Sequence, residues 1–249
     1  MRESETLTPF DQKMQDATGL LGDGDFAGSA ILFNEALGLA STPNEQVMAR
    51  QMEGVALSRD GKFEEAKSRL NAAIKMAMHI HDYPLELRVR RDLAMAYVDA
   101  AQRWRYLLRR DELLRDADAM LRRCHEGLQI LGLHEEAWVT AGFMGRVELV
   151  AGSRFNAEKA LRDADKELRK TLTPNYDYIL DNMMWLVRAV PRKERLAMKA
   201  DILNLIGKTG QDRRYDELRL IMLGGDGLYR FVRALPKWAI RLGKRMFGS

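Results

Sequence analysis

The sequence predicts an all-α protein built of antiparallel helix pairs. Apolar residues recur at spacings of three and four, as at Phe33, Ala36 and Leu37, which is the period of a helix buried on one face. Runs of alternating β-branched residues, which would indicate strands, are absent. Threonine-proline pairs and single glycines punctuate the chain, and these are typical signals for the starts and ends of helices.

The helix boundaries can be placed from this punctuation. Helices are expected to begin at Thr8-Pro9, Thr42-Pro43 and Thr173-Pro174, where threonine caps the helix and proline occupies its first turn. Helices are expected to end at Gly22, Gly61 and Gly152, because glycine adopts the left-handed conformation that closes a helix.

Composition narrows the class of protein. The chain has 249 residues, of which 46% are hydrophobic and 31% charged, so it can bury a substantial core. No stretch free of Asp, Glu, Lys and Arg exceeds nine residues, which is too short to cross a bilayer. One cysteine, Cys124, excludes an internal disulfide, and the polar first residues show no secretory signal. We therefore expect a cytoplasmic protein.

Two segments near the start of the chain repeat one pattern. In each, a glycine and an aromatic residue are followed by a small, a large and a small residue, five, nine and twelve positions after the glycine. The copies are Gly24, Phe26, Ser29, Phe33, Ala36 and Gly61, Phe63, Ala66, Leu70, Ala73. Small residues let two helices approach closely, glycine supplies the turn, and large residues fill the remaining space.

This pattern resembles the tetratricopeptide (TPR) repeat. Units fit at about 10–43 and 46–80, and a third begins near Leu87 with an insertion at about 102–112. Ala117, Leu121 and Cys124 fit the second helix of the third unit, and a fourth unit runs to Thr171. The spacing exceeds the usual period of about 34 residues and is similar to the longer-period variants of bacterial regulatory proteins. The resemblance covers residues 10–171 and implies a right-handed stack of helix pairs, an α-solenoid, with a concave face.

Two further regions complete the domain organisation. Helices are expected at 176–189, 192–206 and 212–223, and residues 172–223 are interpreted as a helical cap on the repeats. Residues 224–249 form a basic tail. In the insertion, Arg103, Trp104, Arg105 and Tyr106 could stack on bases. We favour an exposed helix extension, since Asp111, Glu112 and Asp116 follow and can pair with these arginines.

The sequence carries only weak matches to the residue patterns of catalytic or metal sites. His79, His81, His125 and His134 lack the spacing of a metal site, and Asp23-Gly24-Asp25 is explained by the repeat turn. Cys124 stands at a small-residue position and has no activator, which favours packing over nucleophilic catalysis. We expect no enzyme activity, metal or cofactor, although an unrecognised active site on a helical scaffold is a remaining alternative.

The resemblance implies that the first helix of each pair lines the concave face. Carried onto this chain, the partner-binding residues are Gln51, Arg59, Arg88, Arg91, Met95 and Arg146. Arginine suits carboxylates and methionine suits adaptable apolar contacts, so an acidic protein or peptide segment is the expected partner. Two alternatives stay open: these arginines pair with acids on neighbouring helices, or the repeats sense a peptide or small ligand in a regulatory protein.

The tail predicts an amphipathic helix. Its candidate anionic-surface residues are Arg230, Arg233, Lys237, Trp238, Arg241, Lys244 and Arg245. On a helical wheel the basic residues share one side and Leu228, Phe231 and Leu235 lie opposite, with a kink expected at Pro236. This pattern is typical of a helix in a membrane interface. It fits a peripheral attachment to an anionic membrane and equally an apolar stripe packed on the repeats, and nucleic acid is the less favoured partner.

The sequence as a whole therefore predicts a non-catalytic adaptor or scaffold of TPR-like repeats, with a C-terminal tail able to tether it to an anionic surface.

Overall fold

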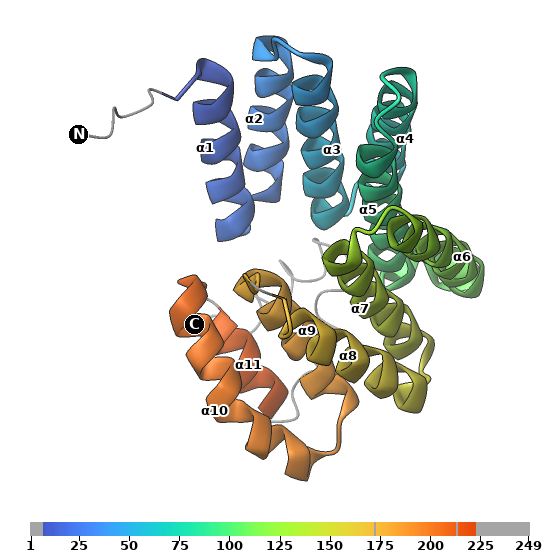
Figure 1. Ribbon diagram of the computed structural model, residues 1–249, viewed down its shortest axis with the longest axis vertical. Coiled ribbons are helices and arrows are strands. Elements are labelled where there is room, and N and C mark those ends of the chain that lie inside the picture. Colours follow the sequence, from blue (N-terminus) through green and yellow to red (C-terminus); the bar gives the residue numbers. More distant parts are fainter. Residues whose placement is uncertain (1–6, 172, 213, 223–249) are drawn as a thin grey trace, which may run out of the picture. The chain divides into compact units, whose positions relative to one another are not determined.

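The computed structural model describes residues 7–171, 173–212 and 214–222. These residues form eleven α-helices and one 3-10 helix, and no strand occurs among them. In chain order they are α1 (Pro9–Asp23), α2 (Phe26–Leu39), α3 (Pro43–Asp60), α4 (Phe63–His79), α5 (Tyr83–Ala101), η1 (Trp104–Arg109), α6 (Arg110–Ile130), α7 (His134–Ala151), α8 (Arg154–Leu168), α9 (Tyr176–Ala189), α10 (Arg192–Thr209) and α11 (Arg214–Met222) (Figure 1). The all-α prediction is confirmed.

The chain divides into two compact units at Ala100. Unit 1 contains α1 to α4 and nearly all of α5, and unit 2 contains η1 and α6 to α11. Within each unit, helices that follow one another in sequence pack side by side, such as α1 with α2, α3 with α4 and α7 with α8. In unit 2 the first helices of successive pairs also touch, α7 with α9 and α9 with α11.

The punctuation signals place most helix ends correctly. Thr8 and Thr42 each form a capping box, with Asp11 and Glu45 respectively. Gly61 and Gly152 close α3 and α7 in the left-handed region, at φ of 85° and 97°. Glycine is required at these turns because a Cβ there would clash with the following carbonyl oxygen.

Two of the expected boundaries are wrong. Gly22 lies inside α1, and Gly24 caps this helix instead, at φ 84°. The Thr173-Pro174 signal does not start a helix, and the helix begins at Tyr176, as the expected range 176–189 has it, because Asn175 is its N-cap and accepts hydrogen bonds from the backbone of Asp177 and Tyr178. Asparagine is as good an N-cap as threonine, and it stands directly before the first helical residue.

The register of the predicted repeats recurs in the packing. A Cβ added to Gly54 would lie 2.6 Å from Leu70 Cγ, and one added to Gly145 would lie 2.7 Å from Leu161 Cγ. The added Cβ would also lie close to the carbonyl oxygen of an alanine on the partner helix, 3.4 Å from Ala66 in the first pair and 3.3 Å from Ala157 in the second. The equivalent positions in α1 and α2 are taken by Ala17 and Ser29, and the Ala17 carbonyl accepts a hydrogen bond from Ser29 Oγ.

The insertion was expected as an exposed helix extension. It is the 3-10 helix η1, which has no buried residue and runs directly into α6. Ala117, Leu121 and Cys124 are fully buried on α6, as expected for a second helix. Ion pairs between the arginines of this segment and the acids that follow were expected. Arg109 forms one with Glu112, and its Nε lies 3.1 Å from Glu112 Oε2.

Unit 2 has a large core to which α7 through α11 contribute. Leu180, Met184, Ile202 and Ile206 are among its fully buried side chains. The helices expected at 176–189, 192–206 and 212–223 correspond to α9, α10 and α11, and the interpretation of residues 172–223 as a cap stays a prediction. The domain limits at 10–171, 172–223 and 224–249 likewise stay predictions.

A buried asparagine sits where three of these helices meet. Asn182 on α9 is 3% exposed and donates from Nδ2 to the carbonyl of Leu161 on α8. A Cβ on Gly142 of α7 would lie 2.7 Å from Asn182 Oδ1. Gly142 therefore leaves room for an amide that joins α9 to both helices of the preceding pair.

Over residues 7–171, 173–212 and 214–222, none of the helices has the length and hydropathy needed to cross a membrane.

Candidate functional site

The first helices of successive pairs are joined by polar side chains, and we call the surface they form the first-helix face. In unit 1 it comprises α3 and α5. Gln51 Nε2 donates to Asp92 Oδ2 at 2.6 Å, and Ser58 Oγ donates to Asp99 Oδ2 at 3.2 Å. Both bonds span 41 residues, so α3 and α5 run in a fixed register along this face.

Arginines flank these bonds. Arg59 Nε lies 3.6 Å from Asp99 Oδ2, and 43% of the Arg59 side chain is exposed. Arg91 is buried, with Nε 4.0 Å from Asp92 Oδ1. Arg88 and Met95 are half-buried on the same helix, α5. The structure thus brings five of the six expected groove residues onto two adjacent helices.

The carboxyl group of Asp92 is unusual among these residues. Burial raises the pKa of Asp92, and the opposing effects of Arg91, the Gln51 hydrogen bond and Arg59 do not cancel that rise. Asp92 joins α3 to α5 although its burial is unfavourable, so its role is structural. Its negative charge also partly neutralises the nearby Arg91 and Arg59.

The sixth expected residue, Arg146, belongs to unit 2. It is 4% exposed on α7 and forms an ion pair with Asp181 on α9. Asp181 also accepts from Arg214 Nη2 on α11 at 2.9 Å. Arg146, Asp181 and Arg214 therefore link the three first helices of unit 2 in one line.

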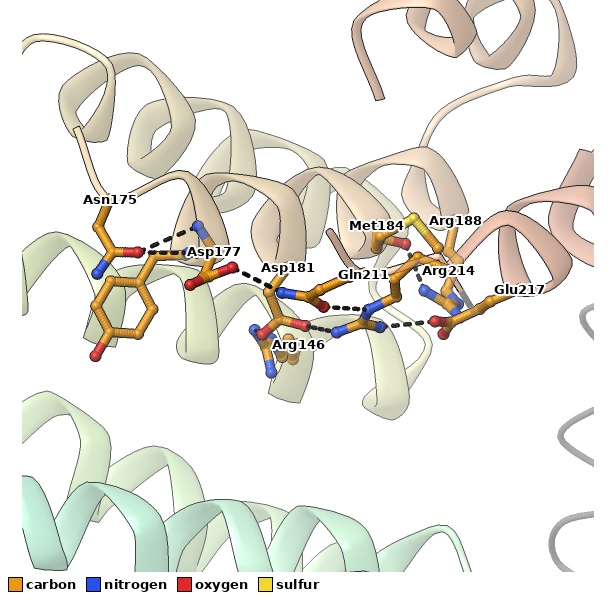
Figure 2. A network of polar contacts seen from close by, with 10 residues as sticks. Arg146, Asn175, Asp177, Asp181, Met184, Arg188, Gln211, Arg214 and Glu217 are labelled. Carbon is orange, nitrogen blue, oxygen red and sulfur yellow. Dashed lines mark hydrogen bonds and ion pairs between the residues drawn. The ribbon is translucent and has the colours of Figure 1, made fainter. Parts of the chain in front are cut away.

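The line continues along α9 and α11. Figure 2 shows Arg214 between Asp181 and Glu217, with its Nη1 donating to Glu217 Oε2 at 2.6 Å. Arg188 Nη2 donates to Glu217 Oε1, also at 2.6 Å. Burial raises the pKa of Glu217, but Arg214 and Arg188 outweigh burial and lower it. Burial lowers the pKa of Arg214, but Asp181 and Glu217 outweigh burial and raise it.

Aromatic rings hold the arginines in place. The Arg146 guanidinium lies 4.3 Å from the centroid of Phe143 and 5.3 Å from that of Trp185. The Arg188 guanidinium lies 5.0 Å from the Trp185 centroid. These are cation–π distances, so Trp185 contacts both basic groups.

Each unit therefore has a polar ladder of the same composition on its first-helix face. In unit 1 it holds Arg59, Arg88, Arg91, Asp92 and Asp99, and in unit 2 Arg146, Arg188, Arg214, Asp181 and Glu217. Each ladder has three guanidinium groups and two carboxylates. Such a surface can accept an anionic side chain, because guanidinium groups bind carboxylates through paired hydrogen bonds.

The sequence did not single out Asp181, Trp185, Arg188, Arg214 or Glu217. Their helices were expected, but were interpreted as a cap outside the repeat register. The signal that could have found them is a spacing: Asp181 follows Arg146 by 35 residues and Arg214 follows Asp181 by 33, which is close to one repeat.

Of the remaining candidate groups, Cys124 and His125 are packed, whereas His79, His81 and His134 are exposed. Cys124 is buried. His125 Nδ1 lies 2.8 Å from the carbonyl oxygen of Ala137, and its ring packs edge-on to Trp138. No group of three or more His, Cys, Asp or Glu residues able to hold a metal occurs in the part of the chain that the structure describes. The expected tail residues Arg230, Arg233, Lys237, Trp238, Arg241, Lys244 and Arg245 lie outside the described residues.

Comparison with known proteins gives similarity of structure without similarity of sequence. No family model matches the chain, and no curated protein matches it. Among solved structures, a singly substituted form of a kinesin light chain candidate from Podosopora anserina with nearly identical TPR-like repeats has a TM-score of 0.50 at 15% identity, covering 80% of this chain and 95% of that one.

Two further structures have TM-scores of 0.48. One is that Podosopora anserina protein in a second crystal structure, at 14% identity over 84% of this chain and 93% of its own. The other is BtubC (BKLC) from P. vanneervenii, at 13% identity over 89% of this chain and 94% of its own. The recurring register of Gly54 and Gly145, together with the match at a TM-score of 0.50, shows that this chain has the TPR-like helical-repeat fold.

Proposed function

We propose that this protein is a non-catalytic adaptor that binds an acidic segment of a partner protein along its first-helix face. The observation that carries the proposal is the polar ladder, in which arginines lie against carboxylates along the first helices of each unit. Proteins with TPR-like repeats generally act as interaction scaffolds, and their first helices line the binding surface.

Unit 1 offers the more accessible part of this face. Arg59 is exposed, Arg88 and Met95 are half-buried, and the side chain of Met48 on the neighbouring α3 is 46% exposed. Basic forks beside flexible apolar side chains suit an amphipathic acidic segment. In unit 2, Arg146 and Arg188 are buried in their own ion pairs, so that part of the face supports the helices rather than the partner.

The test uses the full chain with Arg59→Gln and Arg88→Gln together. Its matched control is Arg122→Gln with Arg162→Gln, which removes the same charge from exposed arginines on the second helices α6 and α8. Binding is measured to synthetic peptides of equal length and of acidic, neutral or basic composition. Since a charged hydrogen bond contributes about 1.5–3 kcal/mol, the first double variant should bind acidic peptides about tenfold or more weakly.

The control variant should bind acidic peptides as the wild type does, and added salt should weaken binding in both. Equal loss in the two double variants would show that only net charge matters and would contradict a site on the first-helix face. A preference for basic peptides would contradict the acidic partner. The C-terminal tail as an attachment to an anionic surface is part of the same proposal, and anionic-vesicle binding that is unchanged by Arg241→Gln with Lys244→Gln and Arg245→Gln would contradict it.

A further inference from the structure

The 3-10 helix η1 carries three large apolar side chains that project into solvent. Leu108 is 101% exposed, Leu107 65% and Trp104 57%, and no residue of η1 is buried. Single exposed apolar residues are ordinary on a protein surface, but a run of three within five positions marks a contact surface. The side chain of Leu108 is as exposed as in an extended chain, so it protrudes rather than lining a pocket.

The geometry of η1 places two of these side chains on one side. In a 3-10 helix, residues three apart lie one above the other, so Trp104 and Leu107 share one side, and Leu108 lies about a third of a turn further round. The α7–α8 turn lies at the same end of unit 2, because the Arg110 guanidinium bonds the carbonyl of Val150 near the end of α7. Phe155, in the first turn of α8, is 81% exposed at this end. We call Trp104, Leu107, Leu108 and Phe155 the apolar edge.

Basic residues surround the apolar edge. Residues 103–110 contain four arginines and no acidic residue, and Arg154 precedes Phe155. Arg105, Arg109 and Arg154 are exposed. The acids begin only at Asp111 and Glu112, where Glu112 pairs with Arg109. The segment that protrudes therefore combines bulky apolar side chains with positive charge.

We propose that the apolar edge inserts into the interfacial region of an anionic membrane. Tryptophan and leucine flanked by arginine suit that region, because the apolar side chains enter the acyl boundary while the guanidinium groups meet lipid phosphates. A protein partner would have to supply a pocket around every side of Leu108, whereas a bilayer surrounds a protruding side chain without a matching shape. This surface is independent of the first-helix face and of the C-terminal tail.

The test is co-sedimentation of the full-length chain with vesicles of phosphatidylcholine alone or of phosphatidylcholine with phosphatidylserine. The test variant carries Trp104→Ser, Leu107→Ser and Leu108→Ser. Its matched control is Ile130→Ser, an aliphatic side chain that is 86% exposed at the other end of α6. Leu108→Ser alone is a second test variant, since a fully exposed side chain contributes nothing to the folded core.

The wild type and Ile130→Ser should bind the anionic vesicles equally and neutral vesicles weakly. Because each buried CH₂ group contributes about 0.8 kcal/mol, the triple variant should bind at least about tenfold more weakly, with Leu108→Ser between the two. Arg105→Gln should weaken binding to anionic vesicles only, since each basic residue near an anionic leaflet contributes about 1 kcal/mol.

A further full-length variant, Arg241→Gln with Lys244→Gln and Arg245→Gln, separates this surface from the tail. Retained binding by that variant, with loss in the triple variant, would support the apolar edge. Unchanged vesicle binding by the triple variant would overturn the proposal. If the triple variant lost peptide binding but kept vesicle binding, the proposal would also be overturned, and the apolar edge would be identified as a protein contact. The first-helix face is tested by peptide binding of the Arg59→Gln with Arg88→Gln variant and the apolar edge by vesicle binding of the triple variant, so failure of the two proposals can be told apart.

Discussion

At the scale of single residues, the helix pairs depend on positions where a hydrogen atom is the only side chain that fits. Gly54 and Gly145 face leucine side chains so closely that a methyl group would overlap them. Glycine in the middle of a helix is unfavourable by about 1 kcal/mol relative to alanine. Its presence at both positions therefore reflects the distance between helices rather than the preference of either helix.

Gly54→Ala should destabilise unit 1. The new Cβ would lie 2.6 Å from Leu70 Cγ, and overpacking of this kind costs about 1–3 kcal/mol. Gly19→Ala is the control, because Gly19 lies on α1 with no atom within 4 Å of the added Cβ, and alanine there should stabilise slightly. The free energy of unfolding in urea measures both. A stable Gly54→Ala variant would mean that α3 and α4 are not in the described register.

A second residue-scale feature is a buried carboxyl group on α3. Glu53 is 4% exposed, and its Oε1 lies 2.9 Å from Arg69 Nε, while Oε2 has no hydrogen-bond partner among the described residues. Burial raises the pKa of Glu53, more than the nearby Arg69 and Arg50 lower it. The folded chain therefore holds this proton more tightly than the unfolded chain does.

Glu53→Gln should change how stability depends on pH. In the wild type, the free energy of unfolding is reduced as pH rises from about 4.3, the ordinary carboxyl pKa, through the raised folded value. Glutamine does not titrate, so the variant escapes this loss. The free energy of unfolding of the variant, relative to that of the wild type, should thus increase with pH across that window. The increase is at most about 1.4 kcal/mol for each unit by which folding raises the pKa of Glu53. Urea titrations at a series of pH values measure it, and a constant difference would contradict a raised pKa.

At the scale of elements, α11 is attached to its neighbours both by apolar burial and by charge. It buries Leu218 and Ile221 in the core of unit 2, while Arg214 and Glu217 bind Asp181 and Arg188 on α9. Helix periodicity and caps were enough to predict where α9, α10 and α11 lie in the sequence. They could not predict these pairs, because partners some thirty residues apart become neighbours only once the stacking of helices is known.

Glu217→Gln should loosen α11. Replacing a charged partner of two arginines should cost about 1–3 kcal/mol at neutral pH. Because the folded pKa of Glu217 is lowered, its contribution is present above the ordinary carboxyl pKa and is lost as pH falls through the folded value. Hydrogen exchange should show faster exchange in residues 214–222. Exposed Glu126→Gln on α6 is the control, and equal effects of both substitutions would contradict a specific role for Glu217.

At the scale of the whole molecule, each helix pair depends mainly on its neighbours in sequence, as expected for stacked repeats. This local character explains why the fold could be predicted from two short copies of a pattern. The candidate site was harder to predict. The repeat register predicts which residues lie on a face, but not how exposed each one is. The burial of Arg146 depends on Phe143 on its own helix and on Trp185 and Asp181 of the next pair.

Local stability should be visible as separate responses of the two units. Gly54→Ala should lower hydrogen-exchange protection in α1 to α4, and Gly145→Ala should lower it in α7 and α8. Each substitution should leave most of the other unit protected, because its contacts stay within one unit. Uniform loss across residues 7–222 in either variant would show that the chain unfolds as one cooperative body.

The amide of Asn182 has a consequence for the order in which the pairs assemble. Chains made of similar repeats are prone to dock the wrong copies together or to exchange copies between molecules. The Asn182 amide fits against the α7–α8 pair because Gly142 leaves space for it and the Leu161 carbonyl accepts its hydrogen bond. At the position equivalent to Gly142, the α3–α4 pair carries Gln51, which has a long side chain in place of a hydrogen atom and is bonded to Asp92. The Asn182 side chain thus favours docking of α9 on the α7–α8 pair over docking on the similar α3–α4 pair.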